Sequence, residues 1–176
     1  IDDEKFLKNS LELKSEINNL KDESYVKQLG GFKSGNLNIN LGKFSQIFID
    51  LLMNKNFSEY FNYLTDENIK NYEILTGGNV NFPKSKKQLF HTDGNWNPRM
   101  IVVNIASSDI NLKNGPIEIL EKSHKVKLPY WKFLLNKKFN SKKIKLNFGD
   151  ILIREHRLWH RGTSNNSNEF REMIGI

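Results

Sequence analysis

The hydrophobic pattern of this 176-residue chain changes period near residue 73. Before that point apolar side chains recur at helical spacing, and after it they form short runs separated by turn residues. The turn residues include Asp93-Gly94, Asn114-Gly115-Pro116 and Gly149-Asp150. Many short strands with such turns are typical of a β-sandwich or barrel. The pattern therefore predicts a mostly β fold with N-terminal helices.

Two segments of the N-terminal part have helical periodicity. Residues 3–28 place apolar side chains among Lys and Glu, and Gly30-Gly31 ends that segment. Residues 43–64 carry two consecutive apolar stripes, which core packing is sufficient to explain. We expect one domain over residues 1–176, in which a helical part (1–72) packs on a β core (73–176).

The β core contains eight runs that we expect to form strands. They are residues 73–82, 88–91, 100–106, 116–120, 143–148, 151–154, 157–160 and 170–176. The stretch 124–142 is an exception, because it is long and carries Pro129 and Tyr130-Trp131. It is predicted to hold a short helix or an insert.

Composition excludes several classes of protein and site. The chain has no cysteine, so disulfides, thiolate metal ligands and a cysteine nucleophile are excluded. No apolar run approaches the roughly 20 residues of a membrane span, and no signal peptide is visible. We therefore expect a cytoplasmic protein without a membrane partner. The chain starts at Ile1 and stops within an apparent strand, which is compatible with truncation at either end.

The net charge of +7 is concentrated in one window. Nine lysines and no acidic residue occur between Lys122 and Lys145. This window is either a surface for an anionic partner or substrate, or simply a solvated lysine-rich face. Only five arginines occur, whereas contacts to bases and phosphates favour arginine. We therefore do not expect a nucleic-acid partner, and an anionic small-molecule substrate stays open.

All four histidines lie in the β part of the chain: His91, His124, His156 and His160. His91 and Asp93 are two residues apart, so at the end of a strand they point to the same face. His160 is the best candidate for a third ligand, and His156 is a rival. Two histidines and one carboxylate on one face suit non-haem Fe(II). Each residue alone has a simpler explanation, namely a turn or a packed histidine.

Arg171 lies eleven residues beyond His160, at the start of an apolar run. A guanidinium is a planar group that suits a carboxylate in two-bond geometry. The alternative is a surface salt bridge to Glu169 or Glu172.

At this point the sequence resembles the phytanoyl-CoA dioxygenase family of Fe(II)/2-oxoglutarate oxygenases. The resemblance covers about residues 73–176 and consists of an ordered series of motifs. They are Gln88-Leu89-Phe90-His91-Thr92-Asp93-Gly94, Asn114-Gly115-Pro116-Ile117-Glu118-Ile119, Ser123-His124-Lys125, Phe148-Gly149-Asp150-Ile151-Leu152-Ile153, Trp159-His160-Arg161-Gly162, Asn165, Ser167 and Arg171. The chain departs from the family at Glu121-Lys122, where Pro-Gly is frequent.

The resemblance implies a double-stranded β-helix, or jelly roll, with the cofactors Fe(II), 2-oxoglutarate and O₂. It implies that His91, Asp93 and His160 are the catalytic residues that hold iron and that Arg171 binds the distal carboxylate of 2-oxoglutarate. The strands of His91 and His160 would be neighbours, with Arg171 in the facing sheet. Gln88 and Asn104 are further candidates for cosubstrate contact.

The implied reaction is hydroxylation of a small molecule, with release of succinate and CO₂. Related halogenases lack the carboxylate ligand, so Asp93 favours hydroxylation. Trp96, Arg99 and His156 are candidates for substrate contact, although Trp96 has the alternative of a hydrophobic lid. Arg154 is interpreted as a surface charge. The alternatives for the whole chain are a non-catalytic metal-binding jelly-roll module and an oxygenase that acts on a macromolecule.

Overall fold

The structure, a computed structural model of the chain, describes residues 35–39, 41–135 and 139–176, together with residues 4, 7, 8, 11, 12 and 15. The helix predicted for residues 3–28 lies outside the described residues, apart from those six isolated positions. In the described part of the chain, no helix is both long enough and apolar enough to cross a membrane.

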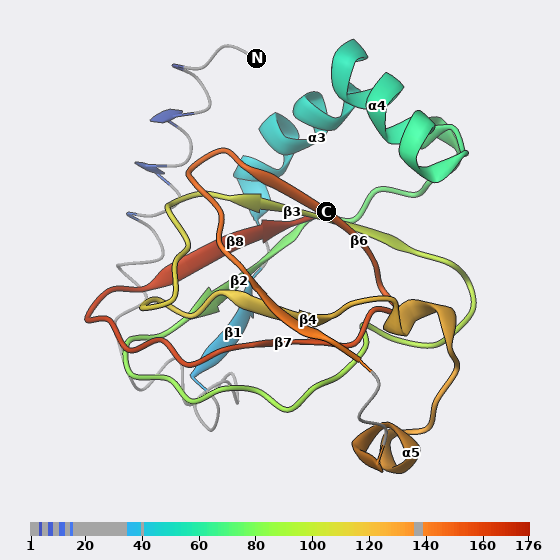
Figure 1. Cartoon of the computed structure of the whole chain (residues 1–176). Coiled ribbons are helices and arrows are strands. Elements are labelled where there is room, and N and C mark those ends of the chain that lie inside the picture. The colour runs from blue at the N-terminus through green and yellow to red at the C-terminus, as the bar shows by residue number, and fades with distance from the viewer. Residues whose placement is uncertain are drawn as a thin grey trace.

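The described strands form two antiparallel sheets (Figure 1). The larger has the order β1 (Asn36–Ile39), β2 (Gly77–Asn81), β8 (Arg171–Gly175), β3 (Ile101–Ala106) and β6 (Ile151–Glu155). The smaller has the order β5 (Ser141–Ile144), β4 (Ile117–Leu120) and β7 (His160–Gly162). An isolated antiparallel bridge between His91 and His160 adds a further extended segment beside β7. This is the predicted mostly β jelly roll, and the fold class is confirmed.

Strand boundaries differ from the prediction in several places, and β2 begins at Gly77 although a strand was expected from residue 73. β1 lies in the region 1–72, where only helices were expected, although Leu37 and Ile39 alternate with asparagines as a strand requires. Residues 88–91 form only the bridge at His91, and residues 157–159 form a turn before β7. β5 begins two residues earlier than expected and ends at Ile144. The boundaries of a strand depend on the strands with which it pairs, and the local sequence pattern carries no information about those partners.

The predicted helix 43–64 is two helices, α3 (Ser45–Met53) and α4 (Lys55–Thr65). Asn54 separates them with extended backbone (φ −57°, ψ 134°), and its side chain accepts a hydrogen bond from the backbone N–H of Asn56. An Asn that caps a helix in this way favours a new start over continuation. A further helix, α5 (Tyr130–Leu135), confirms the short helix predicted in 124–142. Between residues 35 and 176, the described part also contains the short 3₁₀ turns η2 (Gly42–Phe44), η3 (Ile69–Asn71) and η4 (Ser123–Lys125).

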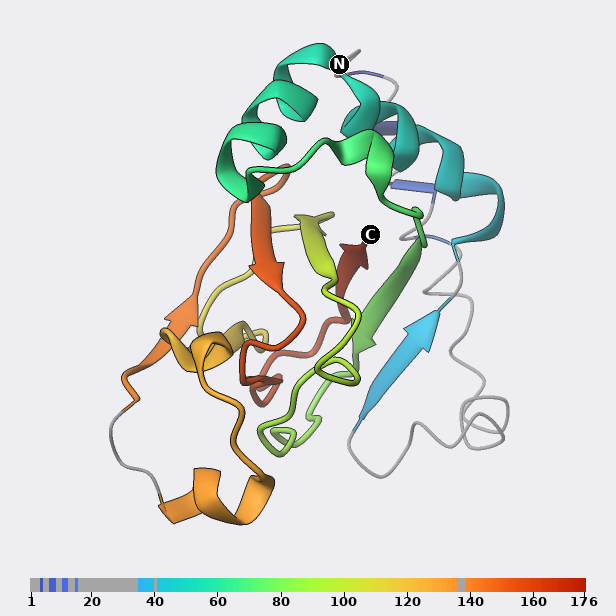
Figure 2. The same ribbon diagram turned by 90° about the vertical axis from the view of Figure 1, so that its right-hand side faces the viewer.

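Side chains that alternate along the strands of the larger sheet point either into a hydrophobic core on one face or toward a cavity on the other. The helices α3 and α4 pack on one face, and both ribbon views place them on the side of the molecule away from α5 (Figure 2). The buried side chains shared by these helices and that face are Phe48, Leu51, Leu52, Phe61, Val80, Val103, Ile105 and Ile174. Each contributes about 1.5–3 kcal/mol through burial. The opposite face carries polar side chains from the same strands, and it faces the smaller sheet.

Candidate metal centre

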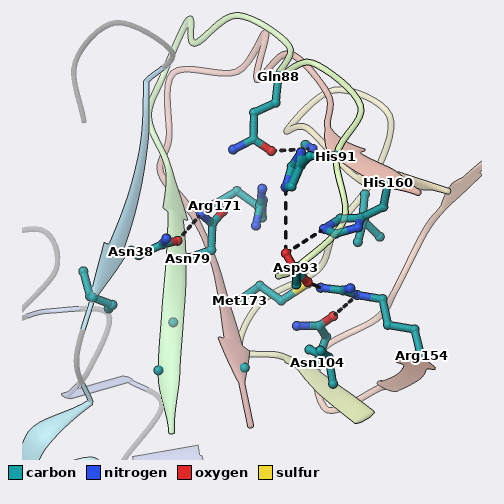
Figure 3. Close-up of a pocket in the computed structure, with 17 residues that line it drawn as sticks. Asn38, Asn79, Gln88, His91, Asp93, Asn104, Arg154, His160, Arg171 and Met173 are labelled. Carbon is teal, nitrogen blue, oxygen red and sulfur yellow. Dashed lines mark hydrogen bonds and ion pairs between the residues drawn. The ribbon is translucent and has the colours of Figure 1, made fainter. Parts of the chain in front are cut away.

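A cavity of about 330 Å³ is lined by residues from both sheets (Figure 3). The residues two apart along β8, Arg171 and Met173, line it, as do Val102 and Asn104 of β3. Ile174, the residue that follows Met173 on β8, belongs to the helix-covered core. Period-two alternation thus turns the polar residues of these apolar strands toward the cavity.

The structure brings together the three residues that the sequence suggested as ligands. His91 and His160 exchange two backbone hydrogen bonds of 2.9 Å, which place their rings 4.5 Å apart. Asp93 Oδ1 lies 3.4 Å from His160 Nε2 and 3.9 Å from His91 Nε2. One ligand atom from each of the three lies within 4.8 Å of the others. The three ligand atoms are therefore close enough to one another to bind one metal ion from one side.

The backbone fixes the orientation of both imidazoles. Nδ1 of His91 lies 2.9 Å from the carbonyl oxygen of Leu89, and Nδ1 of His160 lies 2.9 Å from that of Leu158. A carbonyl oxygen only accepts, so each Nδ1 carries the proton and donates. Each Nε2 then presents a lone pair toward Asp93. Holding the other nitrogen in this way is how proteins orient metal-binding histidines.

The ionisation of the cluster also suits a cation. Burial raises the pKa of Asp93, but the charges of Arg154 and His160 and a hydrogen bond from Arg154 outweigh it and hold the pKa below its ordinary value. Burial, with the nearby charge of Arg154, lowers the pKa of His160 to about 4. At neutral pH Asp93 is therefore an anion and His160 is neutral, which is the ligand state that a divalent metal requires.

Arg154 is the main site residue that the sequence analysis missed. It was interpreted as a surface charge, but its side chain is only 7% exposed and lines the cavity. Its Nη2 lies 2.6 Å from Oδ2 of Asp93, and its Nε donates to Oδ1 of Asn104 at 3.1 Å. The alternation of β6 contained the signal, because Ile151 and Ile153 pack against the helix-covered core and Arg154 points the other way.

Arg171 lies across the cavity on β8 and is 2% exposed. The alternative of a surface salt bridge is therefore wrong. Its Nε and Nη1 are buried and have no hydrogen-bond partner among the described residues. Burial lowers the pKa of Arg171 to about 10, against the opposing charge of Glu172, so the group stays positive at neutral pH. A buried guanidinium with unpaired N–H groups is suited to an anion that enters the cavity.

The two other cosubstrate candidates also line the cavity. Gln88 accepts a hydrogen bond from the backbone N–H of Gly162 at 2.8 Å, which ties the segment before His91 to β7. The carbonyl of Asn104 is occupied by Arg154, so its direct contact is with that arginine. Their contact with a cosubstrate stays a prediction.

The three substrate candidates are not among the residues that line the cavity. His156 is fully buried, its Nε2 donating to the carbonyl of Asn95 at 2.7 Å while its Nδ1 accepts from the backbone N–H of Met100 at 3.0 Å. Its ring nitrogens are thus used to hold the loop that follows Asp93. This placement corrects the expectation that His156 is a pocket residue or a rival ligand.

The other two candidates, Trp96 and Arg99, are also bound to neighbouring groups. The guanidinium of Arg157 lies 4.8 Å from the ring centre of Trp96. Arg99 donates to Glu155 at 2.6 Å and to Glu67 at 2.8 Å. Like His156, they stabilise the loop that follows Asp93. Spacing along the chain suggested proximity to the site, but it could not indicate the direction of these side chains.

Comparison with known proteins agrees with this geometry. The family model "Phytanoyl-CoA dioxygenase (PhyH)" matches residues 33–173. No curated protein sequence matches the chain.

Several solved structures share the fold. AviO1 from Streptomyces viridochromogenes Tue57 matches with a TM-score of 0.60 and 18% identity, over 72% of this chain and 58% of AviO1. EvdO2 from Micromonospora carbonacea var. aurantiaca, solved in complex with 2-oxoglutarate, has a TM-score of 0.59 and 12% identity, over 80% of this chain and 64% of EvdO2. The non-heme alpha ketoglutarate dependent epimerase SnoN from nogalamycin biosynthesis has a TM-score of 0.50 and 17% identity, over 57% of this chain and 44% of SnoN.

The chain therefore spans less than two thirds of the length of each of these proteins. The family model nevertheless covers most of the chain, including all three residues of the His-Asp-His cluster and Arg171. The chain belongs to the phytanoyl-CoA dioxygenase family, whose enzymes are oxygenases that use non-haem Fe(II), 2-oxoglutarate and O₂.

Proposed function

We propose that this chain is a catalytic 2-oxoglutarate-dependent dioxygenase that hydroxylates a small molecule and releases succinate and CO₂. One observation carries the proposal. A cluster of two imidazoles and one carboxylate shares a cavity with Arg171, whose buried Nε and Nη1 have no hydrogen-bond partner among the described residues. The first group suits a ferrous ion with open coordination positions, and the second suits a carboxylate.

Each residue has a distinct role in this proposal. His91, Asp93 and His160 would hold Fe(II), which supplies the oxygen-activating chemistry when 2-oxoglutarate and O₂ bind. Arg171 would orient 2-oxoglutarate through its distal carboxylate. Gln88 would keep the His91 segment aligned with β7 through its bond to Gly162. The buried setting of Arg171 strengthens its attraction for a carboxylate by excluding water.

We also propose the type of reaction, hydroxylation, and the size of the substrate. Asp93 would supply the carboxylate ligand, which favours hydroxylation over halogenation. The similar fold of SnoN, an epimerase by its name, makes product analysis necessary. A cavity of about 330 Å³ is small enough that a small-molecule substrate fits it better than a polymer. The cytoplasmic location expected from the sequence stays a prediction.

The test is turnover of 2-oxoglutarate by the protein reconstituted with Fe(II) in air. We expect succinate to form in equal amount to the 2-oxoglutarate consumed, slowly without a primary substrate, and not in an Asp93→Ala variant. With a small-molecule extract and isotopically labelled O₂, a hydroxylase places one labelled oxygen atom in a product. A wild-type protein that binds Fe(II) and 2-oxoglutarate but forms no more succinate than Asp93→Ala would instead be a non-catalytic binding module.

A further inference from the structure

Arg154 lines the cavity and has one buried N–H group, Nη1, for which the described residues offer no acceptor. Nη2 is bonded to Asp93 and Nε to Asn104, but Nη1 has no hydrogen-bond partner among the described residues. A guanidinium N–H taken out of water without an acceptor costs free energy. An acceptor from a cavity ligand removes that cost.

Two existing bonds hold the guanidinium of Arg154 in place. The 2.6 Å contact to Asp93 and the 3.1 Å bond to Asn104 fix the plane of the group before any ligand arrives. Asn104 is itself buried and lies opposite Leu152 in the pairing of β3 with β6. A donor whose orientation is already fixed loses little conformational freedom on binding, so it binds more strongly.

The distal carboxylate of 2-oxoglutarate already has an anchor in Arg171. Arg171 is on β8 and Arg154 is on β6, and β3 lies between these strands. Two strand spacings separate β8 from β6 by roughly 10 Å. In Figure 3 Arg171 lies toward β2 and β8, whereas Arg154 lies on the other side of Asp93. The two guanidiniums therefore suit two different anionic groups.

The charge of the cavity favours a second anion. Its charged lining residues are Asp93, Arg154 and Arg171. Because a ferrous ion and a 2-oxoglutarate dianion cancel each other, the loaded cavity keeps the positive charge of one guanidinium. Glu172 is not a lining residue, and its charge acts on Arg171, the opposite anchor. The charge of the loaded cavity lining thus favours an anionic substrate over a neutral one.

We propose that Arg154 docks a carboxylate or phosphate group of the primary substrate, which makes this substrate an anionic small molecule. The inference rests on the proposed function. The one competing source of the same chemistry is the carboxylate of 2-oxoglutarate nearest the metal, and the experiment separates the two sources.

The experiment uses the wild-type protein saturated anaerobically with Fe(II) and 2-oxoglutarate. Acetate and inorganic phosphate are the anionic probes, and acetamide is the neutral probe matched in size to acetate. Isothermal titration and the visible charge-transfer band of the iron-bound keto acid report occupancy. We expect at least one anion to bind saturably and at least tenfold more tightly than acetamide. Arg154→Gln, at saturating Fe(II), should lose this preference, and the matched control Arg99→Gln should keep it.

The possible failures have different meanings. No charge-transfer band in the wild type contradicts the proposed function and with it this inference. A normal band with equal binding of acetate and acetamide overturns the inference alone. The inference is also overturned if Arg154→Gln keeps the preference for anions. It is overturned as well if Arg154→Gln lowers the affinity for 2-oxoglutarate tenfold while the wild-type protein does not bind the anionic probes, because Arg154 then binds the cosubstrate.

Should Arg154→Gln fail to retain iron, crystals of the loaded wild type soaked in bromide give a second test. The inference expects anomalous signal within hydrogen-bond distance of Nη1 of Arg154. Bromide bound elsewhere on the protein, with none at Nη1, overturns it.

Discussion

The five arginines include two pairs in contrasting environments. In the cavity pair, the side chain of Arg154 is 7% exposed and Arg171 is 2% exposed, and both keep N–H groups without partners in the described part of the chain. The outer pair, Arg99 and Arg161, is more exposed and bonded to carboxylates. Arg161 donates to Glu118 at 2.7 Å.

This difference separates arginines that stabilise the fold from arginines that await a ligand. An outer arginine has its anion in the protein already, so its removal should affect stability. A cavity arginine keeps N–H groups without an acceptor in the described part of the chain, so we expect its removal to affect binding. The predictions below test that division, beginning with the anion that the cavity group shares with the metal.

Asp93→Ala should produce the largest effect. It removes one of the three proposed ligands and leaves Arg154 without its carboxylate. Loss of residues that merely support ligands typically costs 10–100-fold in metal affinity, so loss of the ligand should cost more than about 100-fold. Metal analysis after gel filtration measures this. Asp50→Ala, on the exposed side of α3, is the control and should retain iron.

Arg171→Gln should retain iron but bind 2-oxoglutarate more weakly. Removal of charged donors to a carboxylate costs about 3 kcal/mol, roughly 150-fold in affinity. Thermal unfolding of the Fe(II) protein reports the loss, because 2-oxoglutarate should raise the melting temperature of the wild type and not of the variant. Equal stabilisation of both proteins by 2-oxoglutarate would show that Arg171 is not the anchor.

Arg154→Gln should weaken iron binding by about tenfold, the lower end for a residue that supports a ligand. Glutamine cannot supply the positive charge that now lies 2.6 Å from Oδ2 of Asp93. Arg154→Lys keeps that charge and should restore much of the affinity. Titration with Co(II), followed by its visible absorption, compares the three proteins; indistinguishable curves would contradict this role of Arg154.

Arg99→Ala should change stability alone, by about 1 kcal/mol or less, because its partners are partly solvated. Urea unfolding measures it, and iron and 2-oxoglutarate affinities should equal those of the wild type. A loss of iron affinity comparable to that of Arg154→Gln would remove the distinction between the two pairs.

The stabilisation by this outer network should depend on pH in a defined direction. Burial raises the pKa of Glu155, but hydrogen bonds from Arg157 and Arg99 more than offset it, so the folded-state pKa lies below the ordinary 4.5. The contribution is therefore complete above about pH 4.5 and is lost as pH falls through the lowered value. The stability difference between the wild type and Arg99→Ala should shrink in acid; a difference that grows would contradict this assignment.

The sequence was most informative where geometry is local. The i, i+2 spacing of His91 and Asp93 correctly indicated one face. The family resemblance correctly implied that His160 lies beside His91 and that Arg171 lies in the opposite sheet. Alternation also contained the inward direction of Arg154, although a charged residue at a strand end was interpreted as surface.

The sequence was least informative where partners are distant. Arg99 meets Glu67 and Glu155, which lie 32 and 56 residues away, and no spacing rule indicates such pairs. His156 has strand spacing from His160, yet a turn separates them and directs its ring to backbone groups. Tertiary contacts therefore decided which polar residues near the motif reached the cavity.

Anaerobic titration of the wild-type protein with Fe(II) and then 2-oxoglutarate tests the metal and cosubstrate site most directly. The site predicts a weak visible charge-transfer band that saturates at one 2-oxoglutarate per iron, is absent in Asp93→Ala, and needs far more 2-oxoglutarate in Arg171→Gln. A band that persists in Asp93→Ala, or no band in the wild type at saturation, would contradict it.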